Sequence, residues 1–152
     1  MRYVISRKNT RPISKNIVKL ITHEKKLKLN NISSCLKFKK ACKLSKKKFK
    51  EKILKLKKEG KKICGYAASA KSTTAFNYCG IDNKYVDFIA DSTKEKIGKY
   101  TPGTHIPIVS IKYFRKNYTD VAILCSWNHR NEIIKKEGRF KKSGGKWISH
   151  VK

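Results

Sequence analysis

The chain lacks a long hydrophobic segment. No apolar run approaches the roughly 20 residues that a membrane-spanning helix requires. The first eleven residues, MRYVISRKNTR, also lack the apolar centre of a signal peptide. These two absences argue against an integral membrane protein and a secreted one, so we expect a cytoplasmic protein with no membrane partner.

Cysteine is sparse and its spacing carries no metal-binding pattern. The chain has 5 cysteines, and none of them forms a C-x-x-C pair: Cys35, Cys42, Cys64, Cys79 and Cys125. Structural zinc sites in small domains usually contain such pairs, so we expect no metal site. The last three cysteines lie in apolar segments and are expected to pack as small hydrophobic side chains in a reducing compartment.

Acidic residues and arginine are both scarce. The chain has 10 Asp and Glu against 39 Lys and Arg, which gives a formal net charge of +29. Such a charge attracts nucleic acid, acidic lipid or phosphorylated ligands. Most of the excess is lysine, a solvated point charge, whereas arginine is the residue of bidentate phosphate and base recognition. We therefore favour solvated lysine-rich faces, and a nucleic-acid-binding surface stays an alternative.

The N-terminal part of the chain is predicted to be mainly helical. Residues 2–6 predict a short strand, and Ser14 is expected to cap a helix that includes Ile21. A longer helix follows, in which apolar residues and one serine recur at intervals of three and four and lysines fill most other positions: Cys35, Phe38, Cys42, Ser45, Phe49, Ile53 and Leu56. Gly60 is the expected end of this helix. Its apolar stripe is expected to pack on the sheet described next or on a neighbouring domain.

From residue 62 onward strands alternate with helices. The predicted strands are 63–67, 85–90, 107–110, 121–126 and 146–151, and the predicted helices are 72–79, 111–116 and 131–137. Such alternation is typical of a parallel sheet with right-handed crossovers. The sequence thus predicts an α/β fold: a small Rossmann-like parallel sheet in residues 62–152, with an N-terminal strand and lysine-rich helical arm in residues 1–61.

The first strand runs into a turn of small residues, in the segment KICGYAASAKSTT, residues 62–74. A strand, tight turn and helix in this order often bind phosphate, because the amides at the start of the helix point at the anion. One interpretation is a P-loop, in which Lys71 contacts phosphate and Ser72 a magnesium ion. Ala70 counts against it, because it stands where backbone must wrap phosphate closely.

A second interpretation of the same turn is a dinucleotide-binding fingerprint. Gly65, Ala67 and Ala70 then take the three glycine positions, and Asp91 closes the second strand where an acidic residue can bind a ribose hydroxyl. The third interpretation is a plain turn with no ligand. The spacing leaves these alternatives open.

Two more segments place polar groups beside predicted strands. The loop KYTPGTHIPI, residues 99–108, carries Thr104 and His105 on a Pro-Gly turn, and we expect it at the strand ends where ligands bind. After the strand VAILCS, Trp127 and Asn128 suit stacking on, and hydrogen bonding to, a base or sugar. Each of these side chains also has a purely structural alternative: stabilising a turn or covering the core.

Together these segments resemble a known family. GYAASAKSTTAFNYCGID, VDFIAD, GKYTPGTHIPI, SWNHRNEI and GGKW, in this order, are similar to the C-terminal domain of S-adenosylmethionine-dependent sugar C-methyltransferases. The resemblance covers residues 62–152, and MRYVISRKNTRPIS looks like the linker strand that follows the family's central domain. In that family a zinc-binding module and a methyl-donor domain come first, and the Rossmann-like last domain helps to hold a nucleotide-linked sugar.

The resemblance implies the substrate-side part of such an enzyme. The family's zinc ligands, methyl-donor site and catalytic segment have no counterpart here, so we expect no catalytic residue, no cofactor in this chain and no turnover by the chain alone. S-adenosylmethionine would be bound by the missing domain. The chain would be a fragment, a truncated gene product or a subunit that joins a separate methyl-donor chain. The expected substrate contacts are Gly65, Ala67 and Lys71 at the turn, Asp91 at a hydroxyl-binding edge, and Thr104, His105 and Asn128 at the rim.

Overall fold

A computed structural model describes residues 5–151 of the chain. The chain divides into two compact units, Met1–Cys42 and Lys43–Lys152. Most of the strand predicted at residues 2–6 lies outside the described residues, and Ile5 and Ser6 have no regular structure. Within residues 5–151, no helix combines the length and apolarity that crossing a bilayer requires.

The first unit is helical. Helix α1 spans Lys15–Lys26, and its N-cap is Ser14, whose hydroxyl accepts a hydrogen bond from the Asn16 amide at 3.2 Å. The predicted cap is therefore confirmed. None of the α1 side chains is buried. Helix α2 begins in this unit at Ile32 and continues to Lys58 in the second.

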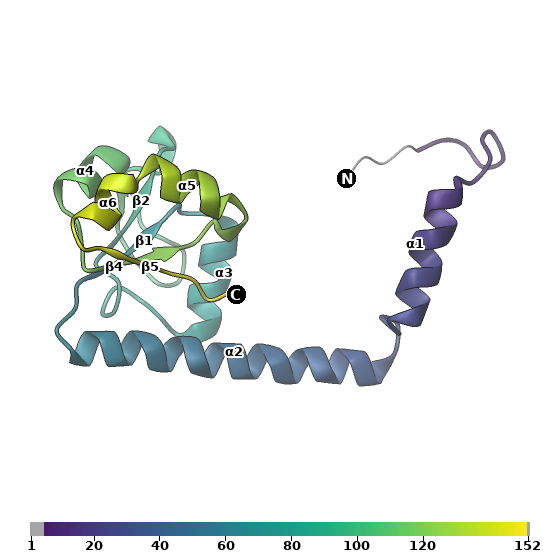
Figure 1. Ribbon diagram of the computed structural model, residues 1–152, viewed down its shortest axis with the longest axis horizontal. Helices are drawn as coiled ribbons and strands as arrows, with labels where there is room; N and C mark the ends of the chain where they lie inside the picture. Colours follow the sequence, from purple (N-terminus) through teal and green to yellow (C-terminus); the bar gives the residue numbers. More distant parts are fainter. Residues whose placement is uncertain (1–4, 152) are drawn as a thin grey trace. The chain divides into compact units, whose positions relative to one another are not determined.

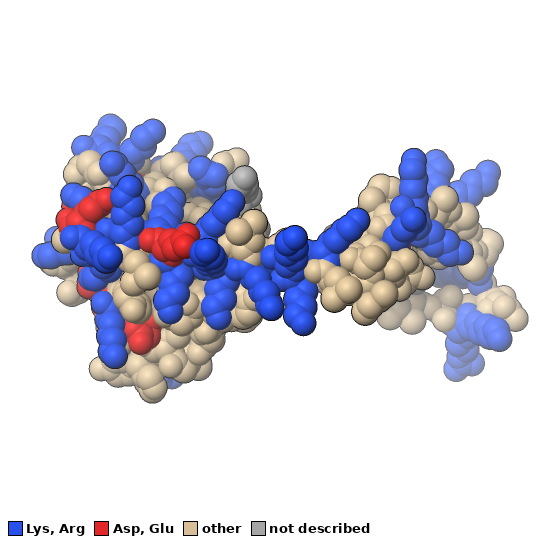
Figure 2. Space-filling view, turned by 90° about the horizontal axis from the view of Figure 1, so that it is seen from below, with Lys and Arg blue, Asp and Glu red and all other residues tan. Residues whose placement is uncertain are grey.

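The apolar stripe predicted on α2 is buried only in its C-terminal part. Phe49 and Ile53 are 4% and 1% exposed and pack in the core of the second unit, whereas Phe38 is 72% exposed. Gly60, with φ of 72°, follows the helix as predicted. Figure 2, which views the molecule from the side of α2, shows basic side chains over much of this face and acidic ones in only a few places.

The second unit contains one parallel sheet, as the sequence predicts. Its strands are β1 (Ile63–Tyr66), β2 (Phe88–Asp91), β3 (Ile108–Ser110), β4 (Val121–Leu124) and β5 (Lys146–Ile148), in the order β3-β2-β1-β4-β5. Residues 85–87 were expected in the second strand but precede it, because Tyr85 and Val86 donate their amides to the Asp82 carbonyl in a turn. The fold is α/β with N-terminal helices.

Helices cover both faces of this sheet. Helix α3 (Ala70–Cys79) and the end of α2 pack on one face; α4 (Ile111–Lys116), α5 (Arg130–Lys136) and α6 (Gly138–Lys142) pack on the other (Figure 1). The chain leaves β1 in one direction through α3 and returns past it through α4 to β4. Right-handed crossovers in opposite directions place their helices on opposite faces. The short 3₁₀ turns Lys94–Lys96 and Trp127–His129, and helix α6, were not predicted.

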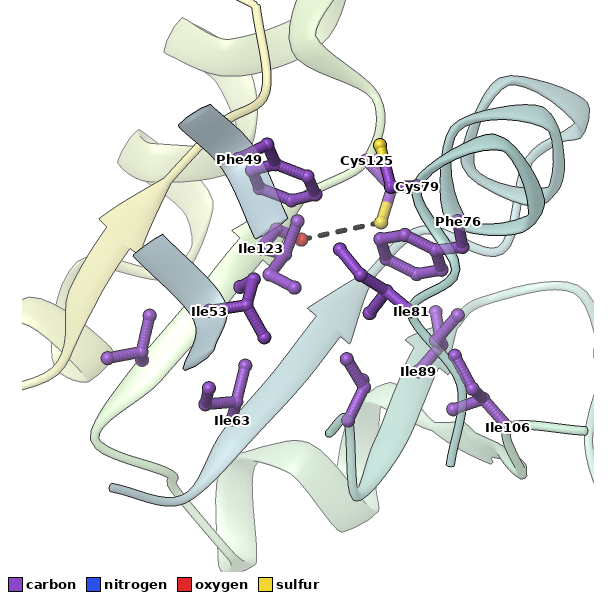
Figure 3. Packing of buried hydrophobic residues seen from close by; sticks show 12 residues of the cluster. Phe49, Ile53, Ile63, Phe76, Cys79, Ile81, Ile89, Ile106, Ile123 and Cys125 are labelled. Carbon is purple, nitrogen blue, oxygen red and sulfur yellow. Dashed lines mark hydrogen bonds between the residues drawn. The ribbon is translucent and has the colours of Figure 1, made fainter. Parts of the chain in front are cut away.

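The core follows the alternation of side chains along the strands. Ile63, Ile89 and Ile123 point to the face of α2 and α3, where Figure 3 shows them against Phe49 and Phe76. Their neighbours along the strands point to the other face: Cys64, Tyr66, Ala90, Ala122 and Leu124. There they meet Phe114 of α4 and Phe140 of α6. Because both faces are buried, the strands are almost continuously apolar.

Candidate functional site

A cleft opens at the carboxyl ends of the strands. It has a volume of about 300 Å³. It is lined by residues at and after the ends of β1, β2 and β4, by the first residue of α4, and by α5 with its N-cap: Tyr66, Ala67, Ala90, Asp91, Ser92, Ile111, Ser126, His129, Glu132, Ile133 and Lys136. The chain leaves β1 and β4 in opposite directions, so this edge of the sheet is its topological switch point. Open α/β sheets bind their ligands at such a point.

The turn after β1 forms the wall of this cleft. Ala67 has a positive φ of 73°, and its amide donates to the Ala90 carbonyl at 2.7 Å. Ser69 caps α3 in a capping box, in which its side chain accepts from the Ser72 amide while the Ser72 side chain accepts from the Ser69 amide. Ser72 is buried, and its hydroxyl donates to the Ser69 carbonyl at 2.6 Å. The Ser72 hydroxyl is thus committed to the helix start, contrary to the P-loop interpretation.

Asp91 supports this turn from the neighbouring strand. Its carboxylate accepts from the Ala68 amide at 2.7 Å and from the Thr93 amide at 2.8 Å, and the Lys96 ammonium lies 3.6 Å away. Burial by itself raises the pKa of Asp91, but the hydrogen bonds from Thr93 and Ala68 and the charge of Lys96 outweigh burial and lower it. Asp91 lines the cleft and also fixes the shape of its wall.

Replacing Asp91 by asparagine is expected to lower the free energy of unfolding by about 2 kcal/mol at pH 7, because a buried charged acceptor is lost. The lowered pKa means that the unfolded chain binds this proton more readily. The stabilisation is therefore complete above the unfolded pKa of about 3.9 and is lost as pH falls through the folded pKa. Urea unfolding of Asp91→Asn between pH 7 and pH 2.5 should show a flatter acid limb. The exposed Glu95→Gln serves as the control, and an unchanged acid limb in Asp91→Asn would contradict this role.

Lys71 and Asn128 lie together beside the cleft. The Lys71 ammonium donates to the Asn128 Oδ1 at 3.0 Å and lies 5.3 Å from the centre of the Trp127 ring. Lys71 is exposed at the start of α3, and Asn128 belongs to the turn after β4. These two predicted contact residues thus meet at the same edge of the sheet as Ala67 and Asp91.

Gly65 is not part of the turn. It lies inside β1, between Ile89 and Ile123 of the neighbouring strands, and is buried. A Cβ at this position would lie 2.8 Å from the Ile89 side chain, so the glycine permits close packing of α3-facing side chains. The expectation that it lines a phosphate-binding turn is wrong because the strand continues for one residue beyond it.

Thr104 and His105 lie at the opposite end of the strands from the cleft. After β2 the chain runs back beside β3, with Gly98 donating to the Ile108 carbonyl, and turns only before β3 begins. The Thr104 carbonyl accepts from Asn83, which precedes β2. The loop therefore stands at the amino ends of the strands, and our expectation that it joins the ligand-binding edge is wrong.

The side chains of this loop also have structural partners. Thr104 is 4% exposed, and its hydroxyl lies 2.7 Å from that of Thr101, which accepts from the Ile106 amide. His105 is exposed with φ of 51°. Gly103 has φ of 77°, and a Cβ there would collide with the Asn77 side chain. The Pro-Gly pattern of this loop therefore reflects the structure of a turn.

Beneath the cleft lies a buried polar network that the sequence did not indicate. The Tyr66 hydroxyl donates to Glu137 Oε1 at 2.8 Å, and Arg115 binds the same carboxylate with its Nε at 3.0 Å and one Nη at 2.8 Å. Glu137 is 2% exposed. Burial and the bond to Glu137 raise the pKa of Tyr66, and the same carboxylate raises the pKa of Arg115. The carboxylate is therefore fully partnered in the interior.

Helix α5 supplies three cleft residues that were not predicted from the sequence, Glu132, Ile133 and Lys136, and its N-cap His129 supplies a fourth. These residues recur at intervals of three and four and so lie on one side of the helix and its N-cap. That spacing was visible in the sequence. What was not visible is that this face meets the ends of β1 and β2, which belong to a segment more than 35 residues earlier.

The buried cysteines are structural, as expected. Cys64, Cys79 and Cys125 are all buried, and burial raises the pKa of Cys64 and of Cys125 to about 12. Such thiols stay protonated at neutral pH and do not act as nucleophiles. Across residues 5–151, no three His, Cys, Asp or Glu residues group in a way that would hold a metal ion.

A doubly wound parallel sheet with a cleft at its switch point is the arrangement in which α/β domains commonly bind ligands. The model of the C-methyltransferase C-terminal domain family matches residues 1–151, and the chain belongs to this family. The chain is also similar to the C-methyltransferase NovU of Streptomyces niveus, with 36% identity over 90 residues. These residues are 59% of this chain and 21% of NovU, so the chain spans about a fifth of that relative's length.

Proposed function

We propose that this chain is the substrate-side domain of a C-methyltransferase and binds a nucleotide-linked sugar in the cleft at the switch point. The observation that carries the proposal is the cleft itself: a solvent-open hollow with polar and apolar lining groups, at the carboxyl ends of the strands in a domain of this family. Its volume of about 300 Å³ is at the lower end of the range of ligand sites, about 300–1,000 Å³. A single sugar ring is of suitable size.

The lining of the cleft offers the groups that a sugar requires. The Ser92 and Ser126 hydroxyls and the Glu132 carboxylate can exchange hydrogen bonds with ring hydroxyls, while Tyr66 and Ile133 provide an apolar surface for the ring. Lys71 and Asn128 stand just outside. In the complete reaction that the family resemblance implies, a base removes a proton beside a sugar ketone and the carbanion takes a methyl group. We assign this base and the S-adenosylmethionine site to another domain or subunit.

Binding can be measured directly by titrating the 152-residue chain with uridine, thymidine and guanosine diphosphate sugars in a calorimeter. We expect saturable binding, and we expect Ser92→Trp to weaken it at least tenfold, because the new ring fills the cleft. Ser92 is exposed, so this variant should fold normally. Ser33→Trp, at an exposed position on α2 outside the cleft, is the matched control. If no nucleotide sugar binds, or if both variants bind equally well, the proposal is refuted.

We also propose that the chain alone does not transfer methyl groups. This rests on its span, which is about a fifth of the related C-methyltransferase. Incubation of the purified chain with S-adenosylmethionine and a nucleotide-linked keto-sugar should give no methylated product by mass spectrometry. Formation of product would refute this part of the proposal.

A second candidate function is that of a docking subunit for a separate methyl-donor chain. It is favoured by the apolar side chains of α1, none of which is buried: Ile17, Val18, Leu20 and Ile21 are each 46–54% exposed. Nucleic-acid binding through the lysine-rich surface is a third candidate, and its signature would be an affinity that falls steeply with salt and responds little to nucleotide sugars.

A further inference from the structure

A second hollow lies next to the cleft, at the corner between the end of α4, the end of α5, and α6. It has a volume of about 530 Å³, and five of its lining side chains are cationic: Arg115, Lys135, Lys136, Arg139 and Lys142. Glu137 is the one carboxylate in the lining. We refer to this hollow as the cationic pocket.

The charge in the cationic pocket is not balanced by the protein. Five cations against one carboxylate leave a formal excess of four positive charges. Glu137 does not offset the lysines, because its two oxygens are occupied by Arg115 and Tyr66. Among the ion pairs within residues 5–151, none involves Lys135, Lys136, Arg139 or Lys142. Like charges gathered in a hollow repel one another and favour a bound anion.

Arg115 adds a fixed donor to this pocket. Its bidentate bond to the buried Glu137 holds the guanidinium in one orientation, yet 48% of the side chain is exposed. A guanidinium carries five N–H donors, so it has donors beyond those given to Glu137. A planar, pre-oriented guanidinium suits the geometry of a phosphate group.

Two contacts connect the cationic pocket with the cleft. Lys136 lines both hollows. Tyr66, which lines the cleft, donates its hydroxyl to Glu137, which lines the pocket. The two hollows are thus neighbours on the face of the sheet that carries α4, α5 and α6, and the second is strongly positive.

We propose that the cationic pocket binds the diphosphate of the ligand whose sugar occupies the cleft. This rests on the function proposed above and deepens it, since it assigns the charged part of a nucleotide sugar to named residues. A diphosphate carries negative charge that would balance the excess cations, and Arg115, Arg139 and Lys142 supply hydrogen-bond donors to it. Lys136 stands where the diphosphate joins the sugar.

The test compares two double variants of the full chain that each lose two positive charges. Arg139→Ala/Lys142→Ala removes cations from the pocket, and Lys141→Ala/Lys146→Ala removes exposed lysines that do not line it. Calorimetric titrations with inorganic pyrophosphate and with the nucleotide sugar that binds best are run at one ionic strength, because charged contacts are screened by salt. We expect the pocket variant to lose about tenfold in affinity for both ligands, as for the loss of charge-assisted hydrogen bonds, and the control to lose less than about twofold.

Each outcome separates this proposal from the one it rests on. A loss of affinity that is confined to the pocket variant supports the assignment of the diphosphate to the pocket. If nucleotide sugars bind both variants with the affinity of the wild type, or if both variants lose affinity equally, this assignment is overturned and the proposed function stands. If no nucleotide sugar binds the wild-type chain, the proposed function fails, and the assignment of the pocket to its diphosphate fails with it, whether or not pyrophosphate binds.

Discussion

Replacing Glu137 by alanine is expected to lower the free energy of unfolding by about 3 kcal/mol, since removing one partner of a buried ion pair strands the other. The variant leaves the Tyr66 hydroxyl without its acceptor and the Arg115 guanidinium without its counter-charge. The loss falls at the lower end for such pairs because Arg115 is 48% exposed and regains water on that side. Urea unfolding at pH 7, followed by circular dichroism, measures the change.

Two further variants show where the effect arises. Glu132→Ala removes a carboxylate that is 78% exposed and lies 3.6 Å from His129, so it should change stability by less than about 0.5 kcal/mol. Tyr66→Phe removes a single hydrogen bond to Glu137 and should cost about 1 to 2 kcal/mol. If Glu137→Ala were as mild as Glu132→Ala, the network would not be a structural element of the domain.

Replacing Phe114 by alanine is expected to cost about 4 kcal/mol, which is the size of the largest core truncations. Phe114 is 0% exposed, and its ring meets those of Tyr66, Tyr118, Phe140 and Trp147 at centroid distances of 5.2 to 6.3 Å. Loss of the ring leaves a cavity among aromatic side chains that cannot close it without leaving their own contacts. The midpoint of thermal unfolding should fall accordingly.

The same substitution at Phe38 is the control. Phe38 is 72% exposed on α2, so Phe38→Ala removes little buried surface and places a good helix former on a helix. We expect its unfolding curve to match that of the wild type within about 0.5 kcal/mol. A Phe38→Ala variant as unstable as Phe114→Ala would mean that Phe38 is covered in solution.

The regular elements of the second unit were largely predictable because their signals are local. VAILCS is apolar throughout, as a strand buried on both faces must be, and β4 is found within it at Val121–Leu124. Ser69 and Gly80 bound α3 through ordinary capping geometry. The strand predicted at residues 85–90 begins three residues late, because Asp82 organises a turn that its apolar neighbours conceal.

The site was less predictable because it depends on which strand ends meet. Ala67 and Asp91 both line the cleft, since Ala67 directly follows β1, Asp91 ends β2, and the two strands are parallel. Thr104 and His105 were misplaced because a turn before a strand and a turn after it look alike in sequence. Gly65 was assigned to the turn when it in fact relieves crowding against Ile89.

The sequence by itself determined that this chain forms a parallel α/β domain preceded by a lysine-rich helix. Strands buried on both faces, helix periodicity and helix caps each depend on residues close together in the chain, so their patterns are visible in the sequence. It also carried, in the order of its motifs, the family to which the chain belongs. Only the tertiary structure decided the strand order, the cleft between β1, β2 and β4, and the cationic pocket beside it. Tyr66, Arg115 and Glu137 are far apart in the chain, and only the packing of helices on the sheet brings one phenol, one guanidinium and one carboxylate together.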